Sequence, residues 1–394
     1  MMRLVPASLQ HFPTNGQVHR VLNISHAYYD IPVFDSTSRY ITGHQVRFAE
    51  RQPTPEDALQ IGYIDLESDG HPWSPIGESR AWSWQQGAMS QWLPNSRTIV
   101  WNDREDARFI TRMFDVESGT TGVLPRPVYA VDPTGRFALS LNMGRLDRLR
   151  PGYGYADGPE NRLDNRKPKE DGVWRMDLDS GDYKLILSLD EAVRFLNSRL
   201  STRSRLGHLL RRYIYWFNHA KISPDGKRFT IKLRYRLPDM NKDWRGWMGV
   251  SLTCGTDGED LRLLADATSH VIWLDTQRLY LWRRDGVYLY SDDSPEGRPE
   301  QRFAPTLIDR DVHIRRLPGT QDQFVFDTPY REEVDLYVFD ASDERHQKIA
   351  SFENHRPRRG LHRCDLHPCP SPDGRKIVVT SLHDGGRQMY LLTR

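Results

Sequence analysis

The segment Asn218–Phe229, NHAKISPDGKRF, contains a tight polar turn, S-P-D-G, between two apolar runs. Nearly the same arrangement returns near the C-terminus, where Leu366–Ile377 reads LHPCPSPDGRKI. Ser, Pro, Asp and Gly are turn formers, and the flanks alternate apolar and polar side chains as strands do. Each segment therefore predicts a β-hairpin, and its recurrence indicates a repeat architecture.

Other parts of the chain follow the same order of strand, turn and strand. Together with the two segments above, these hairpins begin at Val33, Trp92, Val131, Ile222, Trp273, Arg316 and Pro370. A third strand that ends in a polar turn follows, as in IGYIDLESDG or GVWRMDLDSG. Units of this kind, repeated about every 40 to 60 residues, are typical of propeller blades. The sequence predicts an all-β fold, a seven-bladed β-propeller in which residues 1–394 form a single domain.

The two ends of the chain predict how the propeller closes. The segment QVHRVLNIS, residues 17–25, precedes the first complete unit and is expected to form a lone strand. The sequence ends at Arg394, directly after the third strand of the last unit. We therefore expect the strand near residues 17–25 to complete the last blade, because closure removes exposed sheet edges.

An insertion at residues 143–212 is expected between the third and fourth blades. It contains a loop rich in Gly, Pro and Arg, followed by a helix that begins with Ser188 and Glu191 at the spacing of a capping box. The basic residues of the helical part include Arg194, Arg199, Arg203, Arg211 and Arg212. Two interpretations are open: a solvated helix that covers one propeller face, or a lid that recruits an acidic ligand.

The composition limits the class of protein. Lys and Arg number 55 and Asp and Glu 53, which gives a formal net charge of +2 and no sign of a nucleic-acid partner. Three cysteines do not make a disulfide framework. No apolar run is long enough to span a membrane, and the N-terminus lacks the apolar core of a secretion signal. The expectation is a cytoplasmic protein without a membrane partner, and nothing in the sequence indicates its oligomeric state.

Histidines keep a constant distance from the turns of the last four units. His219 and His367 lie five residues before Pro224 and Pro372, His313 lies five before Pro318, and His270 lies five before Asp275, which takes the place of the proline. The intervals between these histidines differ, so the turn determines their position. The strand before the turn is the innermost strand of a blade, so these imidazoles are expected near one mouth of the central channel.

Imidazoles that converge in this way suit two kinds of chemistry. Neutral ring nitrogens bind Zn²⁺, Mn²⁺ and similar ions, and an imidazole is also a general base near neutral pH. The structural alternative is a set of channel-lining histidines that bond only to water and backbone. A zinc knot of Cys364, His367 and Cys369 is a further reading, although the start of a strand does not easily turn three ligands inward.

Several other residues are candidates for binding. His26 and Tyr29 precede the first turn in SHAYYDIP, and Trp84, Gln86 and Gln91 combine a ring face with amides, a mixture that suits carbohydrate as well as ordinary propeller packing. Arg148 belongs to the Arg-rich loop of the insertion. The sequence contains no G-x-S-x-G, P-loop, G-x-G-x-x-G or H-E-x-x-H motif.

The later units resemble a known family. FNHAKISPDGKRF, SHVIW and RCDLHPCPSPDGRKIVVTSLHDGGRQMYLL are similar to the later blades of the oligogalacturonate lyases, over about residues 213–394. The resemblance implies a seven-bladed propeller that cleaves oligo-uronides by β-elimination, with manganese held by histidines and a glutamine. It places His270, His313 and His367 at the metal-binding positions and His219 at the catalytic one. Arg310 stands approximately where that family has its glutamine ligand.

These observations predict a metal-dependent lyase acting on oligosaccharides that contain uronic acid. The cofactor is expected to be a divalent metal ion, Mn²⁺ first, with Zn²⁺ or Ca²⁺ as alternatives. His219 would take the proton next to the carboxylate, and water or the phenol of Tyr29 would protonate the leaving oxygen. His26, Gln86, Gln91, Arg148 and Arg310 are the candidates for binding the acidic oligosaccharide. The alternative is a non-catalytic propeller that binds a glycan or a protein partner.

Overall fold

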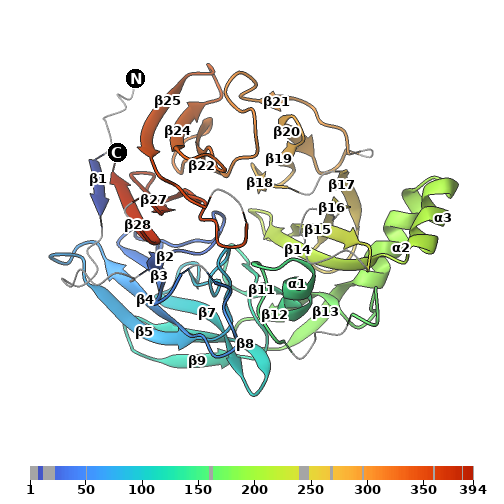
Figure 1. Ribbon diagram of the computed structural model, residues 1–394, viewed down its shortest axis with the longest axis horizontal. Coiled ribbons are helices and arrows are strands. Elements are labelled where there is room, and N and C mark those ends of the chain that lie inside the picture. Colours follow the sequence, from blue (N-terminus) through green and yellow to red (C-terminus); the bar gives the residue numbers. More distant parts are fainter. Residues whose placement is uncertain are drawn as a thin grey trace. The chain divides into compact units, whose positions relative to one another are not determined.

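The computed structural model describes residues 8–11, 23–49, 51–158, 163–238, 248–266, 269–294, 297–357, 360–383 and 385–393. The described strands form seven four-stranded sheets, and the fold is a seven-bladed β-propeller, as the sequence predicts (Figure 1). The chain divides into two compact units. The first contains residues 1–104, 111–123 and 304–394, and the second contains residues 105–110 and 124–303.

The first unit holds the first, sixth and seventh blades and most of the second. The first blade consists of β2 (Asn23–Ser25), β3 (Tyr40–Val46), β4 (Leu59–Asp65) and β5 (Trp73–Ser79). The second blade consists of β6 (Gln91–Trp92), β7 (Thr98–Glu105), β8 (Arg108–Asp115) and β9 (Thr121–Leu124). The sixth blade consists of β22 (Ile314–Arg316), β23 (Gln323–Asp327), β24 (Val334–Asp340) and β25 (His346–Phe352). The seventh blade consists of β26 (Cys369–Pro370), β27 (Lys376–Ser381), β28 (Gln388–Thr393) and β1 (Ser8–His11).

The second unit holds the other three blades and the helices. The third blade consists of β10 (Ala130–Val131), β11 (Phe137–Leu141), β12 (Gly172–Asp177) and β13 (Tyr183–Ser188). The fourth consists of β14 (Ile214–Ile222), β15 (Arg228–Arg236), β16 (Met248–Gly255) and β17 (Arg262–Ala265). The fifth consists of β18 (Val271–Trp273), β19 (Arg278–Arg283), β20 (Gly286–Ser291) and β21 (Arg302–Phe303). The helices are α1 (Met143–Leu149), α2 (Leu189–Arg199) and α3 (Thr202–Arg211).

The predicted hairpin turns are present with one hydrogen-bond pattern. The Gly226 N–H donates to the Ser223 carbonyl (2.9 Å), and the Gly374 N–H donates to the Ser371 carbonyl (2.8 Å). The Ser223 hydroxyl bonds to Asp225, and the Ser371 hydroxyl bonds to Asp373. Both glycines have a positive φ, 74° and 69°, which glycine adopts without steric cost.

The core lies between neighbouring sheets, because both faces of a blade are covered. In β27, Ile377 and Val379 pack into a cluster with Leu317 and Val325 of the sixth blade. Val378, which points to the opposite face, packs into a cluster with Ile41 of the first blade. Alternate side chains of one strand therefore bury against two different blades, which explains the run of apolar residues KIVVTS.

The strand that completes the seventh blade is not the one expected. β1 pairs antiparallel with β28, from Ser8 opposite Thr393 to His11 opposite Tyr390. The sequence analysis expected residues 17–25 to complete this blade. Residues 17–22 lie outside the described residues, and Asn23–Ser25 forms β2, which pairs with β3 of the first blade. Both segments are short, and the choice of partner depends on long-range pairing that a local pattern does not encode.

The insertion also differs from the one predicted at residues 143–212. Residues 172–188 contain β12 and β13, the outer strands of the third blade, so the insertion consists of two pieces. The first piece lies within the third blade and contains α1, and the second joins the third and fourth blades and contains α2 and α3. The predicted capping box is confirmed, with Ser188 and Glu191 each bonding to the backbone of the other. No helix among the described residues is long and apolar enough to cross a membrane.

Candidate functional site

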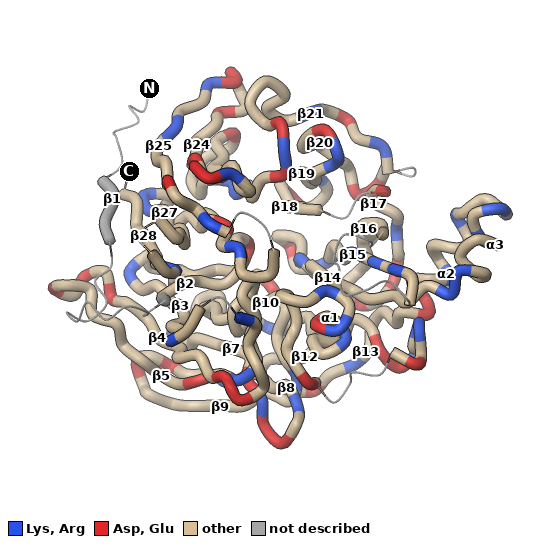
Figure 2. The backbone as a smooth tube through the Cα atoms, in the orientation of Figure 1, with Lys and Arg blue, Asp and Glu red and all other residues tan. Residues whose placement is uncertain are grey.

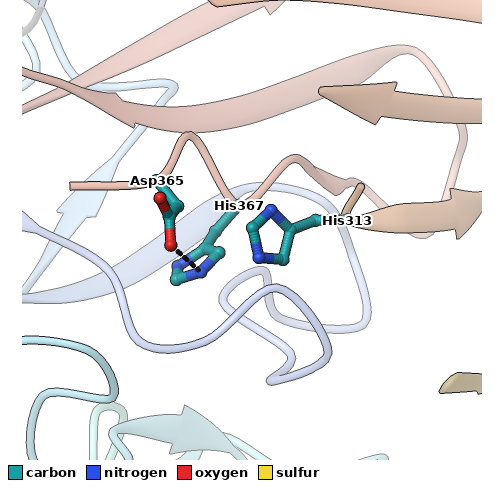
Figure 3. A group of neighbouring side chains, drawn as sticks. All are labelled: His313, Asp365 and His367. Carbon is teal, nitrogen blue, oxygen red and sulfur yellow. Dashed lines mark ion pairs between the residues drawn. The ribbon is translucent and has the colours of Figure 1, made fainter. Parts of the chain in front are cut away.

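Three side chains of the first unit form a compact cluster, His313, Asp365 and His367 (Figure 3). One ligand atom from each lies within 4.8 Å of the others, and the two imidazole centroids are 4.5 Å apart. The carboxylate of Asp365 is 3.9 Å from Nε2 of His367. All three side chains are buried. Two imidazoles and a carboxylate brought together away from solvent are a donor set of the kind that binds a transition metal ion.

The chain path explains why these residues meet. His313 directly precedes β22, and Asp365 and His367 lie in the extended segment that leads into β26. In this segment Leu366 is bonded through its carbonyl to the Thr380 N–H of β27, and its side chain joins the core. On either side of Leu366, the side chains of Asp365 and His367 lie next to each other (Figure 3), and the backbone of His367 turns with a left-handed φ of 50°. Asp365 and His367 are thereby presented together toward His313.

A second carboxylate holds His313 from behind. Asp327, the last residue of β23, lies with its oxygens 2.9 and 3.0 Å from Nδ1 of His313 and accepts the His313 backbone N–H at 2.9 Å. Burial by itself lowers the pKa of this imidazole, but the charge and hydrogen bonds of Asp327 outweigh it, and the pKa is raised. Because Nδ1 is engaged by Asp327, Nε2 is the nitrogen that would bind a metal ion, as is usual for metal-binding histidines.

Two tyrosines pack around this cluster. The ring of Tyr28 lies edge-on to His367, with centroids 4.6 Å apart, and the ring of Tyr29 lies 5.1 Å from that of His313. Both are almost fully buried. The carbonyl of Tyr29 accepts a hydrogen bond from Arg315 of β22, which fixes its backbone to the sixth blade. The predicted residue Tyr29 is therefore beside the histidine cluster.

His26 is also buried in this unit, near a second histidine. Its backbone N–H donates to Thr380, and neither ring nitrogen has a hydrogen-bond partner among the described residues. Burial lowers the pKa of His26 to about 4. Burial and the charges of Arg387 and His26 lower that of His44 to about 3. Both imidazoles are therefore neutral at neutral pH.

The other predicted substrate-binding residues of the first unit have different surroundings. Gln91 donates from Nε2 to the Met89 carbonyl at 3.1 Å within its own turn, which is a structural contact. Gln86 is buried in the same region. Arg310 is half-buried and forms an ion pair with its neighbour Asp309 at 3.2 Å. An arginine cannot replace a metal-binding glutamine, since its guanidinium is a cation without acceptor atoms.

The predicted base, His219, lies in β14 of the second unit, at an irregularity of the β14–β15 pairing. Its φ is 55°, and its backbone N–H donates to the Tyr129 hydroxyl at 3.0 Å and the Asn218 side-chain oxygen at 2.8 Å. The imidazole is buried edge-on to the ring of Tyr153. Burial, and then the charges of Arg234, Lys221, His270 and Lys232, lower the pKa of His219 well below its ordinary value.

Two more predicted residues belong to the second unit. His270 is half-buried and accepts a hydrogen bond from the Trp282 N–H through its carbonyl. Its charge is among the smaller causes of the lowered pKa of His219. Arg148 is exposed on α1. The structure therefore joins His313 to His367 in the first unit and relates His219 to His270 in the second.

The sequence analysis missed both carboxylates of the cluster. Asp365 had a usable signal, since it lies two residues before His367 in RCDLHPC and residues at this spacing share one face of an extended segment. Asp327 had none, because it reaches His313 only through the pairing of β22 with β23. The cysteines of this segment are not part of the cluster. Burial raises the pKa of the Cys364 thiol to about 11 and also raises that of Cys369.

Neither the known protein-family models nor the curated proteins contain a match to this chain. Solved structures do. An oligogalacturonate lyase in complex with manganese is similar with a TM-score of 0.59 and 13% identity, over 99% of this chain and 96% of that chain. The oligogalacturonate lyase from Vibrio parahaemolyticus is similar with a TM-score of 0.52 and 12% identity, over 99% of this chain and 97% of that chain. At this identity the likeness establishes the fold, which confirms the predicted propeller class.

Proposed function

We propose that this protein is a metal-dependent lyase that cleaves oligosaccharides containing uronic acid by β-elimination. The observation that carries the proposal is the buried group His313, Asp365 and His367, with Asp327 orienting His313. The likeness in fold to the oligogalacturonate lyases supports the same reading. The proposed metal ion is Mn²⁺, with Zn²⁺ and Ca²⁺ as alternatives to be tested.

The reaction has a specific electrostatic requirement. The proton to be removed is next to a carboxylate and is only weakly acidic, because the product of its removal carries additional negative charge. A divalent metal ion held by His313, Asp365 and His367 would supply positive charge for that carboxylate. The set fits this role, since its neutral nitrogens and single close carboxylate leave an ion with net positive charge.

His219 is the proposed base. Because its pKa is well below the ordinary value, the imidazole is in its neutral, basic form at neutral pH. The neighbouring cations Arg234, Lys221 and Lys232 that contribute to this shift also favour an anionic substrate. In the proposed step a ring nitrogen of His219 takes the proton from the carbon, and the electron pair forms the carbon–carbon double bond.

The same step breaks the bond between carbon and the glycosidic oxygen. The leaving oxygen must gain a proton, and the phenol of Tyr29 or a water molecule is the proposed donor. Tyr29 is buried beside His313, so its hydroxyl would act in a site with little bulk water. His26 and Gln86 are the proposed contacts to sugar hydroxyls in the first unit. A cytoplasmic location completes the proposal.

The test begins with elemental analysis of the purified protein. The metal is then removed with a chelator, and the enzyme is assayed with oligogalacturonates by the ultraviolet absorbance of the unsaturated product. We expect product formation to depend on metal and to return when Mn²⁺ is restored. A protein that binds no divalent metal and forms no product from any uronide would instead favour the alternative, a propeller that only binds a glycan or a protein partner.

A further inference from the structure

The second unit contains a cavity that shares no residue with the histidine cluster. The insertion between the third and fourth blades forms most of its walls. Its volume is about 630 Å³, and its walls are the segment 164–167, the helices α2 and α3, and the start of β14. α2 packs on β13 and β14, and α3 follows α2 and leads into the start of β14 (Figure 1). The cavity is large enough for a monosaccharide ring, since small-molecule sites begin at about 300 Å³.

The walls are held in place by specific contacts. The Tyr215 N–H donates to the Arg166 carbonyl at 3.0 Å, so the segment 164–167 is fixed to β14. Lys167 pairs with Asp190 of α2 at 2.8 Å. Arg205 of α3 donates to the Asn197 carbonyl at the end of α2 at 2.9 Å. The cavity is therefore a built feature rather than a gap between loops.

One wall consists of aromatic rings that pack against one another. Tyr213 and Tyr215 line the cavity together with His208, whose Nδ1 is 3.0 Å from the Tyr215 hydroxyl. Burial and the charge of Arg211 lower the pKa of His208, so its ring is neutral. Burial raises the pKa of Tyr215, which keeps its phenol protonated. Tyr213 and Tyr215 are 3% and 4% exposed, so they form a packed apolar wall whose neutral polar groups can meet the hydroxyls of a sugar.

The charge of the remaining lining favours an anion. Three cations, Arg166, Lys167 and Arg205, and one acid, Asp164, line the cavity. Lys167 is paired with Asp190 of α2, so the positive charge of the lining comes from Arg166 and Arg205, and the amides of Asn165 and Asn197 add neutral donors and acceptors. The sequence of α3, TRSRLGHLLR, contains no acidic residue (Figure 2). Cations next to ring faces and amides match a ligand that has a carboxylate, hydroxyls and an apolar face.

The helix α3 itself indicates that something covers this region. None of its residues is buried, and Leu206 and Leu209, both in the cavity lining, are 54% and 73% exposed. An isolated ten-residue helix is marginal in water and normally depends on packing of its apolar face. A ligand seated between α3 and β14 would cover these leucines.

We propose that this cavity is a second binding site for an acidic sugar, built on the insertion. The inference deepens the proposed function, from which it takes the uronide as the ligand, but it uses none of the metal-cluster residues. Such a site would bind an acidic sugar unit independently of the metal cluster.

The experiment uses the full-length protein carrying His313→Ala and treated with chelator, so that the metal cluster does not contribute. Binding of galacturonate is measured by calorimetry, with galactose as the probe that lacks only the carboxylate. Leu209→Glu places an anion at the exposed rim, and Leu209→Lys is its matched control. We expect Leu209→Glu to weaken galacturonate binding about fivefold and Leu209→Lys to leave it equal or stronger.

Three other outcomes would overturn the proposed sugar site. Equal binding of galactose and galacturonate, or equal effects of the two Leu209 variants, would overturn the inference. Stronger binding of benzoate than of galacturonate would show a site for apolar anions instead. The two proposals are separable: binding that responds to Leu209→Glu supports this site even in a protein without lyase activity, and lyase activity without such binding refutes this site alone.

Discussion

His367 and His219 occupy equivalent positions in the seventh and fourth blades but have opposite electrostatic surroundings. Each lies five residues before the proline of an S-P-D-G turn, is at most 6% exposed, and has a left-handed backbone, with φ of 50° and 55°. Near His367 are Asp365 and His313, the latter bonded to Asp327. Near His219 are Arg234, Lys221 and Lys232. The turn therefore determines where the imidazole stands, and the neighbouring strands determine which charge it meets.

This difference assigns different chemistry to the two positions. Carboxylates stabilise a bound cation, so the surroundings of His367 suit a metal ion. Cations keep an imidazole neutral and attract anions, so the surroundings of His219 suit a base that acts on an acidic substrate. The predictions that follow test whether the two positions are as different as their charges indicate.

The largest effect is expected from removing a member of the cluster. His313→Ala should weaken metal binding by at least about 100-fold and abolish metal-dependent product formation, because a nitrogen ligand is lost. Elemental analysis after dialysis and a metal titration measure this. Gln91→Ala, a change outside the cluster, is the control and should retain metal. If His313→Ala keeps its full metal content, the cluster of His313, Asp365 and His367 is not the metal site.

His219→Gln should separate the two positions. We expect product formation to fall by about 10² to 10⁴-fold because the base is lost, while metal affinity stays within twofold or so of the unaltered protein. The rate with oligogalacturonate and the metal titration are measured on the same preparation. If His219→Gln loses metal to the same extent as His313→Ala, the two histidines share one role and the comparison fails.

Asp327→Asn tests how His313 is held. The amide keeps the size of the side chain but loses the charge, so the orientation and basicity of the imidazole are less well maintained. We expect metal affinity to fall about 10 to 100-fold. Asp335→Asn, a change at the partly buried start of the neighbouring strand β24, where the carboxylate pairs with Lys348, is the control. An unchanged metal titration would limit Asp327 to a structural role.

Arg234→Met should alter the pH dependence through His219. The positive charge of Arg234 contributes to the lowered pKa, so its removal raises the pKa of His219 toward the ordinary value of 6.5. More of the imidazole is then protonated at mildly acidic pH, and the acid limb of the rate profile should move to higher pH. Arg234→Lys keeps the charge and should keep the profile. NMR titration of His219 in the two variants checks the sign directly.

The smallest effects are expected at the two S-P-D-G turns, where alanine variants test whether the backbones after His219 and His367 are equivalent. An added Cβ at Gly226 would lie 2.4 Å from the Asp132 side chain, and one at Gly374 would lie 2.4 Å from the Pro318 carbonyl. Both residues have positive φ, so each alanine variant should lose about 1–3 kcal/mol of the free energy of unfolding. Denaturant unfolding should give similar losses for the two. Gly319→Ala, where φ is 76° but no atom lies within 4 Å of the added Cβ, should lose less.

Local patterns explain what could be predicted about the fold. The hairpins were predictable because the S-P-D-G turns carry their own hydrogen bonds, and the start of α2 because Ser188 and Glu191 cap it. The strand that completes the seventh blade was predicted wrongly. β1 and the segment that contains β2 are both short, and only pairing with β28 distinguishes them.

The candidate site divides in the same way. The sequence by itself determined that His219, His270, His313 and His367 stand at one offset from a turn, because that offset depends on neighbouring residues alone. The three-dimensional structure alone shows that Asp327 accompanies His313, that His313 meets Asp365 and His367, and that Arg234 and Lys232 accompany His219. These charges come from other strands or other parts of the chain, and the interaction between charges depends on distance in space rather than in sequence.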